Sequence, residues 1–206
     1  GSMNFTLNGA YEDNNNIVSI HSAEVAENYL VEFNEMFVDD FFSSESPSDT
    51  PYPQVTIGET VVETYFSPED NVQDRLMEVI LGAEESIRFM AYSFTADALG
   101  DAIRGMSLEG VSVAGVMEAE QALSNDGTEF DPFKQAALDV RLDGNEGQMH
   151  HKVIIIDNKI VITGSYNFSR NAAEINDENV VIIHSPRIAG LFSNEFLKVL
   201  REATLP

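Results

Sequence analysis

The chain has 206 residues, no cysteine and a formal net charge of −24, from 35 acidic against 11 basic residues. The lack of cysteine excludes disulfides and thiol chemistry, and the acidic excess opposes long-range attraction to nucleic acid or to an anionic membrane. No apolar run reaches the roughly eighteen residues of a transmembrane segment, whereas 43% hydrophobic residues suffice for a sizeable core.

The N-terminal part repeats a segment near the C-terminus. Residues 4–33 (NFTLNGAYEDNNNIVSIHSAEVAENYLVEF) align without gaps with residues 167–196 (NFSRNAAEINDENVVIIHSPRIAGLFSNEF). The sequence therefore predicts that residues 1–42 are the tail of an upstream copy of the same domain. An alternative origin for residues 1–3 is an expression-tag remnant.

A Ser/Pro/acidic linker is expected over residues 43–55, followed by one complete domain over residues 56–206. Hydrophobic periodicity predicts an alternation of strands and helices, which indicates an α/β/α sandwich with a mixed β-sheet. Strands are predicted over 61–65, 87–94, 111–117 and 179–183, helices over 72–83, 96–104, 130–137 and 187–202, and a β-hairpin over 150–167.

The predicted hairpin carries the pattern H-x-K-x4-D-x6-G-S-x-N, from His150 to Asn167. Residues two apart in a strand share a face, so His150 and Lys152 point the same way and His151 does not. A two-residue turn at 158–159 would pair 157 with 160, and hence 150 with 167 and 152 with 165. Such pairing gathers an imidazole, an ammonium, a hydroxyl and a carboxamide on one face.

This set of groups suits a phosphate. A neutral imidazole can act as nucleophile or proton donor, and the other three groups donate hydrogen bonds to anionic oxygens. The four positions hold no carboxylate for Mg²⁺, and the four histidines lack the spacing of zinc ligands. The sequence predicts a phosphodiesterase that needs neither a metal nor another cofactor.

The motif resembles the hallmark of the phospholipase D superfamily, and its layout is similar to that of endonuclease-like members. The resemblance extends from about residue 56 to 206 and implies a nucleophilic His150 that forms a phosphohistidine. It also implies that Lys152, Ser165 and Asn167 hold the phosphate and that Glu178 orients the histidine. Asp157 is expected to be mostly structural, with a catalytic role as the lesser alternative.

Three functions follow from the resemblance. The first is nuclease-like phosphodiester hydrolysis, and the second is hydrolysis or transphosphatidylation of phospholipids. The third is a phosphate-binding half without catalysis, because active sites of the family use two copies of the motif. The second copy is expected either from a homodimer or from intramolecular pairing with an upstream copy, where Asn15 occupies the position of Glu178.

Overall fold

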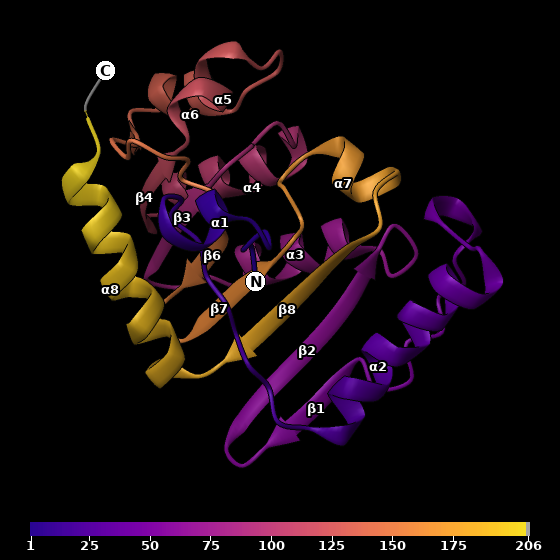
Figure 1. The fold of residues 1–206 in the computed structure, drawn as a ribbon. Coiled ribbons are helices and arrows are strands. Elements are labelled where there is room, and N and C mark those ends of the chain that lie inside the picture. Colours follow the sequence, from indigo (N-terminus) through magenta and orange to yellow (C-terminus); the bar gives the residue numbers. More distant parts are fainter. Residues whose placement is uncertain (205–206) are drawn as a thin grey trace.

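One eight-stranded mixed sheet forms the centre of the computed structural model, which describes residues 1–204 (Figure 1). The strand order is β1-β2-β8-β7-β6-β3-β4-β5. Neighbours are antiparallel except for the parallel pairs β3–β4 and β4–β5. The strands are β1 (Gln54–Ile57), β2 (Thr60–Ser67), β3 (Ser86–Ala91), β4 (Ser112–Met117), β5 (Asp139–Leu142), β6 (Lys152–Ile156), β7 (Ile160–Gly164) and β8 (Glu178–His184).

Helices cover both faces of the sheet, which confirms the predicted α/β/α sandwich. They are α1 (Leu7–Tyr11), α2 (Ala23–Asn34), α3 (Val72–Leu81), α4 (Asp97–Leu108), α5 (Ala119–Ser124), α6 (Phe130–Gln135), α7 (Arg170–Glu174) and α8 (Pro186–Glu202), with a π turn η1 (Glu35–Asp39) and a 3-10 turn η2 (Ser43–Glu45). None of the helices within residues 1–204 has the length and apolar character needed to cross a membrane.

The alternation of side chains along β6 divides the core into two layers. Ile154 and Ile156 belong to the larger cluster, which α3, α4 and α6 cover, whereas Val153 and Ile155 belong to the cluster under α8. Both sets are almost completely buried. A strand buried on both faces needs an unbroken apolar run, which is why residues 153–156 contain no polar side chain.

The register of the motif hairpin differs by one residue from the predicted one. Ile156 pairs with Ile160 and Val153 with Thr163, so the loop has three residues rather than two. Asp157 has a φ of 53° and therefore leaves the strand, and the backbone N–H of Lys159 donates to the Ile156 carbonyl at 2.9 Å. The predicted cross-strand pairs 150–167 and 152–165 are accordingly wrong, because β6 begins at Lys152 and β7 ends at Gly164.

The predicted linker boundary also needs correction. β1 begins at Gln54, which pairs with Glu63 of β2, so the domain starts before residue 56. The stretch before it is tied to the domain: the Ser43 N–H donates to Asp177 at 2.6 Å, and Thr50 Oγ1 donates to Asp70 at 2.8 Å.

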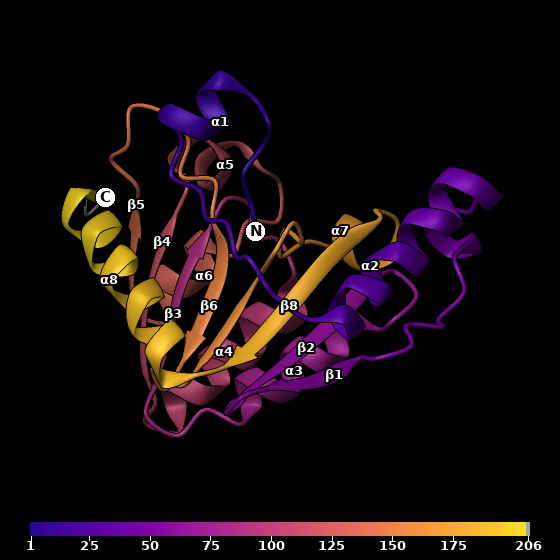
Figure 2. The same cartoon turned by 60° about the horizontal axis from the view of Figure 1, so that its bottom comes forward.

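The N-terminal segment lies over the domain (Figure 2). α1 lies near residues 143–148, where the N–H of Gln148 donates to Asp13 at 3.1 Å. The extended stretch after α1 crosses β8 toward β1 and β2 (Figure 1), and α2 places Tyr29 against Phe66 with ring centres 5.1 Å apart.

Candidate active site

Three neighbouring strands bring the motif residues together at one end of the sheet. Lys152 is the first residue of β6, Ser165 follows the last residue of β7, and Glu178 is the first residue of β8. Because β6–β7 and β7–β8 are antiparallel, the start of one strand and the end of its neighbour lie at the same end of the sheet. His150 precedes β6 and Asn167 follows β7, so all five residues lie at this end of the sheet.

The hydrogen bonds of His150 determine which of its ring nitrogens carries the proton. Nδ1 lies 3.0 Å from the carbonyl oxygen of Ser2 and 3.0 Å from Oδ1 of Asn15, and both oxygens are acceptors. Nε2 lies 3.1 Å from Nζ of Lys152, which is a donor. His150 therefore carries its proton on Nδ1, and its unprotonated Nε2 accepts from Lys152, so the ring is in the neutral form that a nucleophile requires.

Burial and then the charge of Lys152 lower the pKa of His150, which favours the neutral ring at neutral pH. Tyr92 supports the ring from the side, with the ring centres 4.6 Å apart in an edge arrangement. The site thus places the neutral imidazole of His150 beside the ammonium of Lys152.

Lys152 is only 4% exposed, and burial lowers its pKa to about 8. The carboxylate of Glu178 acts in the opposite direction, and Nζ lies 4.7 Å from the ring centre of Tyr92, a favourable position for a cation. Since no described ion pair neutralises this ammonium within residues 1–204, its charge is free for a bound anion.

Ser165 has a hydroxyl proton to offer. Its Oγ accepts hydrogen bonds from the backbone N–H of Asn179 at 3.0 Å and from Nδ2 of Asn179 at 3.1 Å, which use both of its lone pairs. Gly164 allows this approach, because any side chain there would collide with the Asn179 carbonyl. Oδ1 of Asn167 is buried without a partner. Among the described residues, no hydrogen bond joins Ser165 or Asn167 directly to His150 or Lys152.

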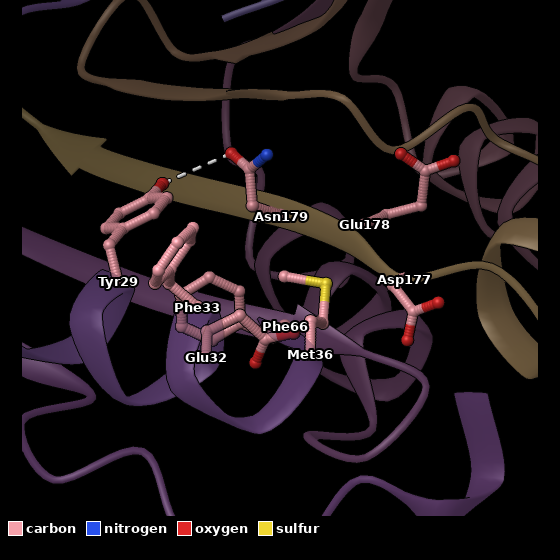
Figure 3. A pocket seen from close by; sticks show the side chains of 8 residues that line it. All are labelled: Tyr29, Glu32, Phe33, Met36, Phe66, Asp177, Glu178 and Asn179. Atoms are coloured by element: carbon pink, nitrogen blue, oxygen red, sulfur yellow. Dashed lines mark hydrogen bonds between the residues drawn. The ribbon is translucent and has the colours of Figure 1, made fainter. Parts of the chain in front are cut away.

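Glu178 does not form the predicted contact with His150. Its carboxylate accepts from Nδ2 of Asn176 at 3.2 Å, and Asn15 occupies the position at Nδ1 of His150 instead. Figure 3 shows the Glu178 carboxylate turned away from Tyr29 and Phe33 of α2. The orienting partner of His150 therefore comes from the N-terminal segment, 135 residues away in the sequence.

Asp157 lies at the other end of β6, about 16 Å along the strand from Lys152 at roughly 3.3 Å per residue. Its carboxylate accepts from the backbone N–H groups of Glu84, Glu85 and Ser86 at 2.9, 2.8 and 2.8 Å. Burial opposes ionisation, but these three donors lower the pKa of Asp157 overall. Its place at the far end of β6 and its three backbone contacts fit the structural role expected of it.

Three residues contact the site in ways that were not predicted. The backbone of Ser2 and the side chain of Asn15 complete the surroundings of His150, and Tyr92 packs on both His150 and Lys152. The internal repeat contains a signal for Asn15, since it aligns with Glu178. The pattern carries no comparable signal for Tyr92.

A cavity of about 700 Å³ beside the site is strongly acidic. It lies between α1, α5 and the loop before β6, and Gln148, two residues before His150, contributes to its wall. Its carboxylates are those of Glu12, Asp13, Glu118, Glu120, Asp143 and Glu146. No group of three or more His, Cys, Asp or Glu side chains suited to a metal ion occurs among residues 1–204.

Comparison with known proteins adds a family and several relatives. The family model described as "Cardiolipin synthase, PLD-like domain" matches residues 76–200. The mitochondrial cardiolipin hydrolase of Mus musculus is 33% identical over 128 residues, which cover 62% of this chain and 58% of that protein. The chain spans between 50% and 63% of the length of the cardiolipin hydrolases it matches.

Two solved structures resemble the chain in different ways. Nuc from Salmonella typhimurium, a phospholipase D family member, is 31% identical with a TM-score of 0.66, over 71% of this chain and 97% of that one. The phosphatidylserine synthase of Haemophilus influenzae is 13% identical with a TM-score of 0.68, over 91% of this chain and 55% of that one. The second match shows a shared fold alone.

Proposed function

Since the chain belongs to the phospholipase D superfamily, we propose that it hydrolyses phosphodiesters with His150 as the nucleophile. The observation that carries the proposal is the proton arrangement of His150, with N–H at Nδ1 and an unprotonated Nε2 that accepts from Lys152. Lys152, Ser165 and Asn167 then hold the non-bridging phosphate oxygens.

The reaction has two displacement steps. Nε2 of His150 attacks phosphorus, the bond to one ester oxygen breaks, and that oxygen leaves as an alcohol after it gains a proton. Water then attacks the phosphohistidine and gives its proton to the group that protonated the leaving oxygen, so that the P–N bond breaks, the phosphomonoester leaves and the neutral imidazole of His150 is restored. The ammonium of Lys152 offsets the charge that builds on the phosphoryl oxygens.

Replacement of the nucleophile tests this assignment. His150→Asn should reduce hydrolysis of bis(p-nitrophenyl) phosphate at least a thousandfold, an order of magnitude typical for loss of a nucleophile. An adduct of ³²P trapped by acid quench should be present in the parent chain and missing in the variant. His151→Asn is the matched control, because His151 is fully buried away from this face and contacts Asn16. Comparable turnover in His150→Asn would overturn the proposal.

A metal requirement is tested with the same substrate. We expect hydrolysis to continue in excess EDTA, because the proposed positive charge comes from Lys152. Loss of activity on chelation, restored by Mg²⁺ or Zn²⁺, would contradict this part of the proposal.

The leaving oxygen needs a proton donor, and we infer that a second copy of the motif supplies it. The N-terminal segment contacts His150 and lies on that side of the site. This supports pairing with an upstream copy rather than a homodimer. A homodimer would have to displace residues 1–22 from the side of the site that faces His150.

Leaving-group dependence tests the missing proton donor. The 206-residue chain should cleave p-nitrophenyl esters, whose phenolate leaves without protonation, but should cleave alkyl diesters very slowly. Sedimentation in the same buffer establishes whether the active species is monomeric. A monomer that cleaves both ester types with similar efficiency would refute the second copy.

For the substrate, nuclease-like hydrolysis is the first candidate, supported by the match to Nuc over 97% of that chain. Phospholipid hydrolysis is the second, supported by the matches to mitochondrial cardiolipin hydrolases, whereas the acidic cavity opposes an oligonucleotide and an anionic vesicle surface alike. Parallel assays with oligonucleotides and with cardiolipin vesicles, on a protein that contains both copies, distinguish the two.

A further inference from the structure

Helix α2 rests on the domain through Val25, Asn28, Tyr29 and Glu32 and leaves the apolar side chains of Leu30 and Phe33 exposed. Asn28 and Glu32 are among its buried residues, whereas Leu30 is 56% exposed and Phe33 51% exposed. Phe37, in the following turn η1, is 77% exposed. An amphipathic helix normally buries its apolar stripe, so this helix lacks the partner that its sequence fits.

The contact of α2 with the domain is electrostatically unfavourable. Burial, and then the carboxylate of Glu69, raises the pKa of Glu32 to about 8, and burial also raises the pKa of Glu35 to about 7. Oε2 of Glu35 and both carboxylate oxygens of Glu69 are buried without hydrogen-bond partners. Such groups cost free energy, and this cost is offset in part by Asn28, which exchanges two hydrogen bonds with the backbone of Tyr52 at 2.8 and 2.9 Å.

The domain contains a helix of the same sequence pattern in a complete environment. α8 covers residues 186–202, and α2 together with η1 covers residues 23–39, the same length at the offset of the internal repeat. Ser185 caps α8 by accepting from the N–H of Ile188, and Ser22 caps α2 by accepting from the N–H of Val25.

The two helices differ in what they cover. α8 buries Ala189, Ser193, Phe196 and Val199 against the sheet, in the cluster formed with β3, β4, β6 and β7. The equivalent residues of the N-terminal segment are Ala26, Leu30, Phe33 and Met36, of which the first three are exposed. The face that α8 buries is thus the face that α2 leaves open.

The remainder of the N-terminal segment follows the same equivalence. The Asn16 N–H and Nδ2 donate to Oγ of Ser2 at 3.2 and 3.3 Å, as the corresponding groups of Asn179 donate to Ser165 at 3.0 and 3.1 Å. The short helices α1 and α7 also begin alike, with Thr6 and Ser169 as their caps. Residues 1–39 therefore repeat the helix caps and Ser–Asn contacts of residues 164–202, but an extended stretch without strand pairing stands where the domain has β8, and the π turn η1 stands where α8 continues.

We propose that the exposed apolar face of α2 is the docking surface for the sheet of a second copy of this domain. Strands equivalent to β3, β4, β6 and β7 would lie under Leu30 and Phe33 as those strands lie under α8. The sheet of the present domain is excluded as the occupant, because α8 already covers it. The inference extends the proposed pairing of two copies and does not depend on the chemistry at His150.

The contacts of the N-terminal segment have the form expected of two copies related by a two-fold axis. Val18 and Ile20 pack on a cluster that contains Val181 and Ile183, which are their own equivalents in the repeat. Residues near a two-fold axis meet their equivalents in this way. The match to the phosphatidylserine synthase structure covers 91% of this chain, so it includes part of residues 1–42. It covers 55% of the synthase chain, which is longer than this one.

Thiol reactivity tests the docking surface, because the 206 residues contain no cysteine. Phe33→Cys is compared with its neighbour Asn34→Cys, which is exposed and whose equivalent on α8, Leu197, is also exposed. A charged maleimide should label both variants rapidly in the 206-residue chain. In the protein translated from the complete reading frame, Phe33→Cys should react at least about tenfold more slowly and Asn34→Cys at an unchanged rate.

Two results would overturn the proposal. One is equal reactivity of Phe33→Cys in both proteins. The other is protection of Phe33→Cys that appears only after phosphatidylcholine vesicles are added, which would make the occupant a membrane. Hydrolysis of bis(p-nitrophenyl) phosphate, measured on the same samples, reports the activity separately, so a failure of the proposed chemistry would leave the reactivity result intact.

Discussion

His150 donates through Nδ1 to two oxygens of the N-terminal segment, one of which belongs to the neutral carboxamide of Asn15. Asn15→Asp places a carboxylate there and stabilises the imidazolium, so the pKa of His150 should rise. The acidic limb of the pH profile of kcat/KM then moves to higher pH, because the imidazole of His150 loses its second proton only at a higher pH. The pH–rate profile and ¹⁵N chemical shifts of the ring measure the change.

Asn8→Asp is the matched control for this variant, since it adds the same charge on an exposed residue of α1. Its acidic limb should stay where it is in the parent chain. Equal shifts in the two variants would mean that overall charge, rather than the contact with His150, sets the titration.

Lys152 has two pH-dependent consequences of opposite sign. Its folded-state pKa of about 8 lies below the ordinary value of 10.5, so the unfolded chain binds more protons between these values. Stability should therefore increase as pH rises from 8 to 10.5, by roughly 3 kcal/mol at most. Vanadate affinity should decrease over the same range, since the ammonium is lost. Urea titrations and inhibition constants measure both, and Lys152→Met should remove both trends.

The residue types of the site could be predicted from the sequence, but their partners could not. The motif spacing identified His150, Lys152, Ser165 and Asn167 as candidates, and alternation placed His151 off the active face. The contact between Asn15 and His150 joins residues 135 positions apart, and only the folded chain brings them together.

At the level of secondary structure, Asp157 anchors the loop between β6 and β7 to the start of β3. Asp157→Ala leaves three backbone N–H groups without their acceptor and should lower the free energy of unfolding by about 3 kcal/mol. The low pKa of Asp157 has a further consequence: its stabilisation is present above the unfolded value of 3.8 and is lost as pH falls through the lower folded value.

Urea denaturation of Asp157→Ala at neutral pH measures this effect. Asp126→Ala is the control, because Asp126 is exposed, and its effect should stay within about 0.5 kcal/mol. A similar small effect in Asp157→Ala would contradict the anchoring role.

The longer elements could be predicted because their periodicity is strong, as in α3, α8 and β6. The short helices α5 and α7 have five or six residues each, too few for a periodic signal, and they were not predicted. The hairpin register was predicted one residue off, because Asp157 adopts a left-handed conformation that hydrophobic alternation does not reveal. The exposed face of α2 was also not predictable, since amphipathicity says which face is apolar but not what covers it.

At the level of the whole molecule, the charge of −24 should govern the response to salt. Proteins that bind nucleic acid through many cationic contacts lose affinity steeply between about 50 and 200 mM salt. We expect this chain to bind a single-stranded oligonucleotide weakly and to bind no less tightly as salt rises, because salt screens repulsion. Fluorescence anisotropy with the inactive His150→Asn chain measures this. A steep loss of affinity with salt would instead indicate a cationic binding surface.

Asn15 and Glu178 hold equivalent positions in the repeat but differ in charge. Two identical halves would allow either histidine to attack, and a diester could then enter in either direction. In the proposed reaction, His150 beside the carboxamide is the weaker base and attacks, whereas the histidine of the proposed second copy, beside the Glu178 carboxylate, would retain its proton for the departing oxygen. A diester with two different alcohols would consequently enter in one direction only and always release the same one.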